Sequence, residues 1–358
     1  MRAAPGGSSG QGENKIMKTR LFTLAAFGAL LAGPAAVQAQ TCDAPPVARC
    51  SGADCAASPV LADRGPVTDP KTGRSFFLDM PCDLKPGEEV TFILNLHGAG
   101  SIGNWQRHYF PAVDYKDQRR LVIATPTAAT ETAMWPGGPP VRRWDGAADD
   151  AHLQNITEMV FEKVGLSNVA AFWLAGHSQG GFTSSRIVCS DFFKDKVDGW
   201  LSLSGGRIGQ APFVAAFGPP LADGSPPPAR TAMRGEMKIA CDISHIFAIG
   251  EHEIESLPET SPWAEKYACG PRVRRPDVVD EKPGHVWDYA RSTYKVWGLA
   301  AAPGTAQIYA FPDCQDGRVV ADVVRINKGH TEGLEPKVTE AILDLIQSAP
   351  GGKARQGT

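Results

Sequence analysis

The chain has 358 residues, of which 42% are hydrophobic and 21% are charged, and its formal net charge at pH 7 is −3. This near balance of charge excludes the strongly basic surface on which nucleic-acid-binding proteins depend. The length and the hydrophobic content suffice for one large α/β core, so we expect a single main domain.

The N-terminal region has the order of a secretory signal. Lys18 and Arg20 precede an apolar stretch at 21–32, and Val-Gln-Ala at 37–39 supplies the small residues of a cleavage site. The apolar stretch is too short for a comfortable membrane span, which favours a signal peptide at 17–39 over an anchor. We therefore expect a secreted or periplasmic protein with no membrane contact after cleavage.

The segments on either side of this signal have compositions of their own. Residues 1–16 are polar and rich in Gly and Ser, so we expect them to be a non-native or disordered extension ahead of a true start at Met17. The mature chain is expected to begin near Gln40, and removal of residues 1–39, with four basic residues and one acidic, takes the formal charge to about −6. A Cys/Pro-rich segment then covers 40–74.

All eight cysteines lie beyond the expected cleavage site. An even number of cysteines in an exported chain predicts disulfides, although the sequence alone does not choose among the possible pairings. The sequence has no C-x-x-C motif and no compact group of His and Cys, so we expect no metal site.

Strand and helix patterns alternate through the rest of the chain. Apolar runs predict strands at 90–96, 121–124, 169–175, 199–203, 245–249 and 307–311. Apolar residues at helical spacing predict helices at 149–164, 181–189 and 335–347. This alternation predicts an α/β domain at 75–348 with a mostly parallel sheet covered by helices on both faces, followed by a flexible tail at 349–358.

The most informative motif lies at 172–181, Phe-Trp-Leu-Ala-Gly-His-Ser-Gln-Gly-Gly. It places Ser178 in a G-x-S-x-G pattern directly after a strand, where a tight strand-to-helix turn would push the hydroxyl out of the sheet. Small residues at Gly176 and Gly180 avoid clashes in such a turn. The pattern predicts a serine nucleophile, and the alternative is a packed serine in a glycine-rich turn.

A second glycine-rich loop, Leu-His-Gly-Ala-Gly, follows the strand at 90–96. Its backbone can present N–H groups to a developing oxyanion, so we expect Ala99 or Gly100 to act with the Gln179 amide in an oxyanion hole. The alternative is an ordinary glycine turn. We expect His97 either to order this loop or to contact a substrate.

A serine hydroxyl needs a histidine as its base and a carboxylate to orient that histidine. His330 is the favoured base because it lies after the last predicted strand and before the final helix, in the chain order serine, acid, histidine. Glu253 is the favoured acid because it stands three residues after Gly250, at the end of the strand at 245–249. Glu251 is the alternative acid.

Together these motifs resemble those of the α/β-hydrolase superfamily. The resemblance covers about residues 75–348, and among members the chain is most similar to secreted polyhydroxybutyrate depolymerases and feruloyl-esterase-like enzymes, which share the HG loop and the G-H-S-x-G-G turn. It implies an eight-stranded, mostly parallel sheet and cofactor-free hydrolysis through an acyl-enzyme. That group usually has Asp where Glu253 stands.

The sequence thus leads to a secreted serine carboxylesterase as the main hypothesis. The substrate would be a small or polymeric ester, such as a polyester or a plant-wall ester, and Trp105, Trp135 and Trp144 are candidates for stacking on it. Burial of these indoles for packing is the alternative. A peptidase or amidase with the same triad, or an exported binding protein without chemistry, are the competing functions.

Overall fold

The computed structural model describes residues 67–133, 137, 140–207, 239–285 and 302–356. The predicted N-terminal extension, the signal peptide, most of the Cys/Pro-rich segment and Trp135 lie outside these residues.

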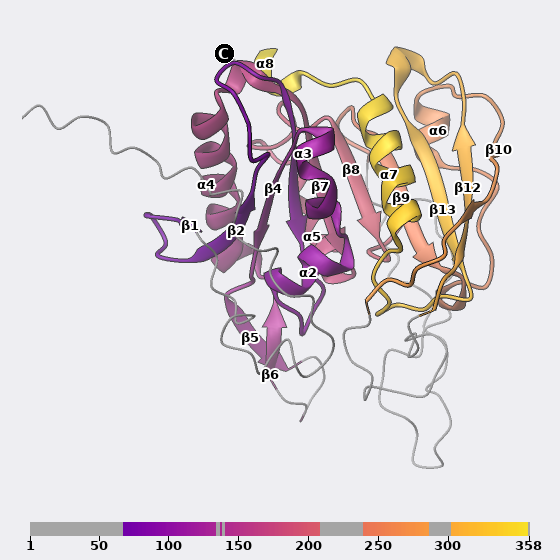
Figure 1. Ribbon diagram of the computed structural model, residues 1–358, viewed down its shortest axis with the longest axis horizontal. Helices are drawn as coiled ribbons and strands as arrows, with labels where there is room; N and C mark the ends of the chain where they lie inside the picture. Colours follow the sequence, from indigo (N-terminus) through magenta and orange to yellow (C-terminus); the bar gives the residue numbers. More distant parts are fainter. Residues whose placement is uncertain (1–66, 134–136, 138–139, 208–238, 286–301, 357–358) are drawn as a thin grey trace, which may run out of the picture. The chain divides into compact units, whose positions relative to one another are not determined.

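The described residues form one large sheet, and its strands follow one another across it in the order β1-β2-β4-β3-β7-β8-β9-β13-β12-β10, with β11 paired to β12 (Figure 1). The strands are β1 (Val67–Thr68), β2 (Ser75–Asp79), β3 (Val90–Leu96), β4 (Leu121–Pro126), β7 (Val169–His177), β8 (Gly199–Leu203), β9 (Ser244–Gly250), β10 (Val273–Arg274), β11 (Val278–Val279), β12 (Thr305–Phe311) and β13 (Val320–Ile326). Six neighbouring strands from β4 to β13 are parallel, and the strands at both edges are antiparallel.

Helices connect the strands and cover the sheet. They are α2 (Gly103–Tyr109), α3 (Lys116–Arg119), α4 (Gly146–Val164), α5 (Gln179–Ile187), α6 (Pro262–Lys266), α7 (Pro336–Ser348) and α8 (Lys353–Gln356). The sheet has eleven strands in the described residues, whereas eight were expected, because three two-residue strands at its edges extend the eight longer ones.

The core lies on both faces of the sheet, as the side-chain alternation of β3 illustrates. Phe92 and Leu94 face the cluster that contains the buried positions of α4, whereas Ile93 between them faces the cluster that contains α2 and α7. The central strands are buried along their whole length, which explains their continuous apolar sequences. The predicted α/β architecture with helices on both faces is therefore confirmed.

The strand β13 and the C-terminal tail differ from expectation. The strand β13 was not predicted, because its two charged residues interrupt an otherwise apolar run, yet Asp322 and Arg325 are both 2% exposed and ion-paired. The C-terminal tail was expected to be flexible but contains α8. Ala354 packs in the core and the Lys353 N–H donates to Asp198 at 3.1 Å, so this segment closes the edge of the domain opposite the site described below.

The strands that matter for the site all end on one side. In Figure 1 the arrowheads of β7, β8 and β9 point toward the lower edge, where a separate hairpin of β5 (Thr130–Ala133) and β6 (Pro140–Arg143) also lies. Loops at the carboxyl ends of parallel strands are where α/β proteins place their ligands. We therefore expect the functional site at this edge of the sheet.

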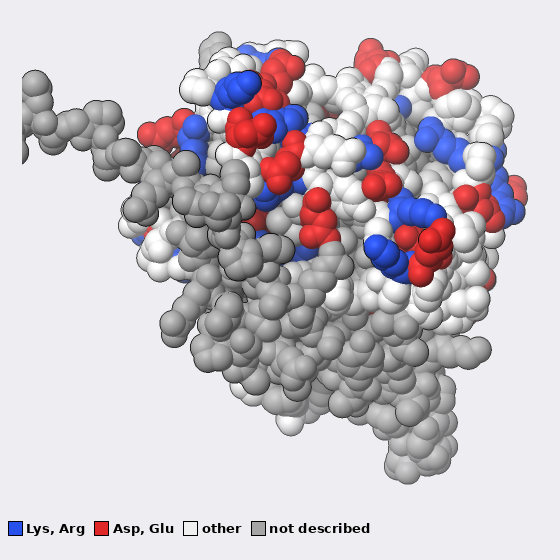
Figure 2. All heavy atoms as spheres, in the orientation of Figure 1, with Lys and Arg blue, Asp and Glu red and all other residues white. Residues whose placement is uncertain are grey.

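Disulfides and surface charge complete the description of the domain. Cys189 pairs with Cys241 and Cys269 with Cys314. On the face shown in Figure 2, acidic and basic side chains lie in mixed groups and form no broad region of one sign among the described residues. None of the helices described here has the length and apolarity needed to span a bilayer.

Candidate active site

Ser178 occupies the turn between β7 and α5. Its φ of 50° and ψ of −118° lie in a region that costs energy for any residue with a side chain. The Ser178 N–H donates to the Leu203 carbonyl at 2.8 Å, and the Ser178 carbonyl accepts from Phe182 at 3.1 Å, so the hydrogen bonds on both sides hold the strained residue in place.

The glycines around Ser178 are required by close backbone contacts. A Cβ atom added at Gly176 would lie 2.3 Å from the carbonyl carbon of Gly180. One added at Gly180 would lie 2.3 Å from the Leu96 oxygen, and one at Gly181 would lie 2.6 Å from the Gly205 Cα. The helix α5 can therefore start this close to β3 and β8 only without side chains at these positions.

The acid and the histidine meet across the neighbouring parallel strands β9 and β13. Glu253 lies in the short 3₁₀ turn Glu251–Glu253 after β9, and His330 lies in the loop after β13. The His330 Nδ1 atom is 2.5 Å from the Glu253 Oε2 atom, and the Glu253 side chain is fully buried. Glu251 is exposed and instead accepts a hydrogen bond from the Asn327 N–H at 2.9 Å. The structure thus brings Glu253, and not Glu251, to His330.

His177 connects the His330 loop to the serine turn. Its Nε2 atom donates to the His330 carbonyl at 2.9 Å, and its ring centroid lies 4.7 Å from that of His330. Tyr109 stacks on the other side of His177 at 3.8 Å and donates to the same carbonyl at 3.4 Å. Because His177 directly precedes Ser178, these contacts connect the His330 loop to the serine turn.

This arrangement decides the fold type. The serine follows the central strand β7, while the acid and the histidine follow β9 and β13, on the same edge of a sheet that is parallel at its centre and antiparallel beyond. The chain has the α/β-hydrolase fold.

Comparisons with known proteins show no family for this chain. No protein-family model matches the sequence, and no curated protein does. Among solved structures, the chain is similar to an acetyl xylan esterase from Aspergillus awamori at 11% identity and a TM-score of 0.43, over 78% of this chain and 96% of that one. It is also similar to TT1662 from Thermus thermophilus (15% identity, TM-score 0.37, 77% and 93% covered) and to SOBER1 from Arabidopsis thaliana (14%, 0.35, 72% and 97%). Likeness at such low sequence identities and TM-scores does not show the activity of this chain.

Within this α/β-hydrolase fold, the loop after β3 lies against the serine. A Cβ atom added at Gly98 would be 3.2 Å from the Ser178 Cβ. The prediction that the Gly100 amide faces an oxyanion is wrong, because it donates to the Arg142 carbonyl of the β5–β6 hairpin at 2.8 Å. Within the described part of the chain, the N–H groups of Ala99 and Gln179 have no acceptor, so these two remain free to bind an oxyanion.

His97 orders this loop from beneath. The ring is fully buried, its Nδ1 atom donates to the Gly98 carbonyl at 2.7 Å, and its Nε2 atom accepts from the Ala128 N–H at 3.0 Å. Burial lowers the pKa of His97 to about 4, so the ring is neutral near pH 7. Of the two roles expected for His97, the structure supports ordering of the loop and not contact with substrate, because both ring nitrogens are used and neither is exposed.

Trp105 and Trp144 are also corrected as substrate residues. Trp105 is 1% exposed and belongs to the core cluster, and Trp144 is 7% exposed. The Trp144 indole donates to the His97 carbonyl at 2.7 Å, and its backbone N–H and C=O pair with the side-chain amide of Gln179 at 3.1 and 3.3 Å. Trp144 therefore supports the loop after β3, whereas Trp105 packs in the core.

The loop that carries His330 is held by a buried group of charges that the sequence did not reveal. Arg325 pairs with Glu335 at 3.0 Å and donates to the backbone carbonyls of Glu332 and Gly333, each at 2.7 Å. Lys328 is 3.1 Å from Glu335. Burial alone would raise the pKa of Glu335, but Arg325 and Lys328 more than offset this effect and hold the pKa below its usual value.

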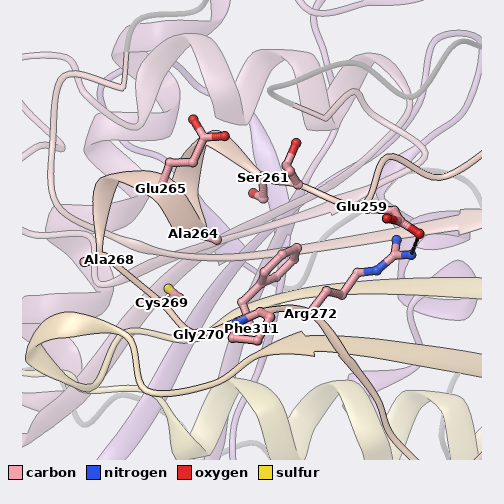
Figure 3. A pocket seen from close by; sticks show the side chains of 11 residues that line it. Glu259, Ser261, Ala264, Glu265, Ala268, Cys269, Gly270, Arg272 and Phe311 are labelled. Atoms are coloured by element: carbon pink, nitrogen blue, oxygen red, sulfur yellow. Dashed lines mark ion pairs between the residues drawn. The ribbon is translucent and has the colours of Figure 1, made fainter.

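A separate pocket of about 470 Å³ shares no residue with this site. Figure 3 shows that Phe311 forms part of its wall and that Arg272 points toward Glu259, from which it is separated by 3.6 Å. Among the described residues, no group of three or more His, Cys, Asp or Glu side chains is arranged to bind a metal ion.

Proposed function

We propose that this protein is a serine hydrolase of carboxylic esters, with Ser178 as nucleophile, His330 as general base and Glu253 as the acid of the triad. The observation that carries the proposal is the 2.5 Å contact between His330 and a fully buried Glu253, on the same edge of the sheet as Ser178, which is held at positive φ. A buried carboxylate on the Nδ1 side fixes the tautomer that leaves Nε2 free to accept a proton.

The proposed reaction has two halves. Ser178 Oγ attacks the ester carbonyl carbon and gives its proton to His330 Nε2, while the Ala99 and Gln179 N–H groups bind the oxyanion and Glu253 stabilises the imidazolium. The tetrahedral intermediate expels the alcohol, which takes the proton from His330. Water then attacks the acyl-serine through the same base, and the acid is released with Ser178 restored.

We propose a carboxylic ester as the substrate and no particular acyl or alcohol group. Burial of Trp105 and Trp144 removes two of the three tryptophans that were candidates for stacking on a polymeric or plant-wall ester, and the third, Trp135, lies outside the described residues. We also propose that the protein is exported through the signal at 17–39, because the disulfides Cys189–Cys241 and Cys269–Cys314 persist in oxidising compartments and are rare elsewhere.

Turnover of p-nitrophenyl esters of increasing acyl length, beside the matching p-nitroanilides, tests this function. We expect ester hydrolysis that falls by at least about 10⁴-fold in Ser178→Ala, the order of loss seen when a triad serine is removed. Faster turnover of the anilides would favour an amidase, and Ser178-independent turnover would refute the proposed nucleophile.

A further inference from the structure

The surroundings of the Glu253 carboxyl group determine how it is oriented toward His330. The Glu253 side chain is fully buried, and among the described residues no Lys or Arg pairs with it. A buried carboxylate in this position depends on hydrogen bonds to its oxygens for stabilisation and for orientation.

The two carboxylate oxygens have separate partners. Oε2 faces His330, whereas Oε1 accepts hydrogen bonds from the Ser204 hydroxyl at 2.8 Å and from the Gly250 N–H at 2.9 Å. The Gly250 N–H lies at the end of β9, just before the turn that carries Glu253, and the Ser204 hydroxyl comes from the segment after β8. The carboxylate is therefore fixed from two directions and cannot rotate without losing a donor.

Ser204 is itself held in an unusual conformation. It follows β8 with a φ of 51°, is 4% exposed, and its N–H donates to the Ala248 carbonyl of β9 at 2.7 Å. A residue with a side chain in this region costs about 1 kcal/mol or more relative to glycine. A glycine at position 204 would adopt this positive φ at lower cost. It would lack the hydroxyl, which is therefore the feature that the serine provides.

We infer that Ser204 is a positioning residue for catalysis, whose hydroxyl fixes the Glu253 carboxylate so that Oε2 stays aligned with His330. This inference rests on the proposed function of the Ser178 site. The Ser204 side chain also shares a hydrogen bond with Tyr109, which stacks on His177, so the test must separate an action through Glu253 from one through Tyr109. The left-handed backbone at Ser204 is the structural cost of bringing this hydroxyl to Oε1.

The test is a double-mutant cycle between Ser204→Ala and Glu253→Ala, with ester turnover as the readout. We expect Ser204→Ala to lower kcat about tenfold with KM unchanged, the size of effect that one hydrogen bond to a charged group supplies. In the Glu253→Ala background, where no carboxylate remains to be positioned, the same substitution should change kcat by less than about twofold.

Ser204→Gly is the matched control for backbone strain, because it also removes the hydroxyl but relieves the positive φ. We expect the glycine variant to lose as much kcat as the alanine variant while melting at a higher temperature. If the alanine variant folds poorly, the glycine variant takes its place in the test.

Two results would overturn the inference while leaving the proposed function intact. One is an equal loss of kcat from Ser204→Ala in both backgrounds, which would mark a general structural role. The other is a Ser204→Gly enzyme with full activity. Wild-type protein without Ser178-dependent turnover would instead refute the proposed function, and this inference with it.

Discussion

Glu253 and Glu251 lie two residues apart, yet their environments differ completely. Glu253 is buried against His330, whereas Glu251 is exposed and caps the backbone at Asn327. In the sequence, the spacing from Gly250 favoured Glu253. The reason lies in space: only Glu253 can turn back toward the Gly250 N–H and at the same time reach the loop after β13.

This difference predicts a contrast between two conservative variants. Glu253→Gln should lower kcat by roughly 10²–10⁴-fold, because an amide does not stabilise the imidazolium and can favour the wrong tautomer of His330. Glu251→Gln should keep kcat within about twofold. Steady-state ester kinetics of both variants, with circular dichroism to check folding, measure the contrast, and equal losses would contradict the assignment of the acid.

The sequence predicted Ser178, His330 and Glu253 as a set because each follows a strand at a position that the chain order makes recognisable. It could not predict that Gly100 donates to Arg142, since that contact joins residues about 40 positions apart across a hairpin whose packing no local pattern encodes. Trp105 was misjudged for a related reason: the helix α2 is rich in polar residues, yet every one of its residues is buried.

At the scale of elements, the site consists of loops that leave neighbouring parallel strands. Six of the eight longer strands of the main sheet and the helices α4, α5 and α7 were predicted from the sequence pattern, to within a few residues at their ends. The strand β13 escaped because Asp322 and Arg325 are charged and buried. Asp322 pairs with Arg207 from the segment after β8, a partner that lies 115 residues away and is visible only in the fold.

The buried charges beneath the His330 loop give an element-scale prediction. Glu335→Gln leaves Arg325 and Lys328 without their shared carboxylate, so we expect the free energy of unfolding to fall by about 3 kcal/mol, as when one partner of a buried ion pair is removed. We also expect a lower kcat, because Arg325 holds the backbone on the C-terminal side of His330.

Glu281→Gln is the matched control. Glu281 is 87% exposed and pairs with Lys337 at 3.4 Å on the surface, so its loss should change the free energy of unfolding by less than about 0.5 kcal/mol. Urea denaturation of the disulfide-intact variants measures both values. A Glu335→Gln protein as stable as the control would contradict the role given to the buried charges.

At the scale of the whole molecule, buried histidines connect stability to pH. Burial, which disfavours the imidazolium, lowers the pKa of His97 to about 4 and that of His245 to about 3. Both rings are neutral in the folded protein near pH 5, whereas in the unfolded chain they titrate near pH 6.5. Below about pH 6.5 the unfolded state therefore binds more protons, and stability falls as the pH falls.

The slope of this loss is a measurable prediction. Between about pH 6 and pH 4.5 each of the two histidines should remove about 1 kcal/mol of unfolding free energy per pH unit. His245→Phe, which keeps an aromatic ring between Trp200 and Trp263, should reduce the total slope by that amount. Urea denaturation at several pH values tests this, and an unchanged slope in His245→Phe would contradict it.

The central claim is that Ser178 is an activated nucleophile, and covalent labelling tests it most directly. The mature protein with intact disulfides is treated with a fluorophosphonate, and the adduct is located by peptide mass spectrometry in wild type, Ser178→Ala and His330→Ala. We expect a single adduct on Ser178 in wild type, none in Ser178→Ala, and much slower labelling in His330→Ala. Folded wild-type protein that takes no label, or takes it on another residue, would contradict the account.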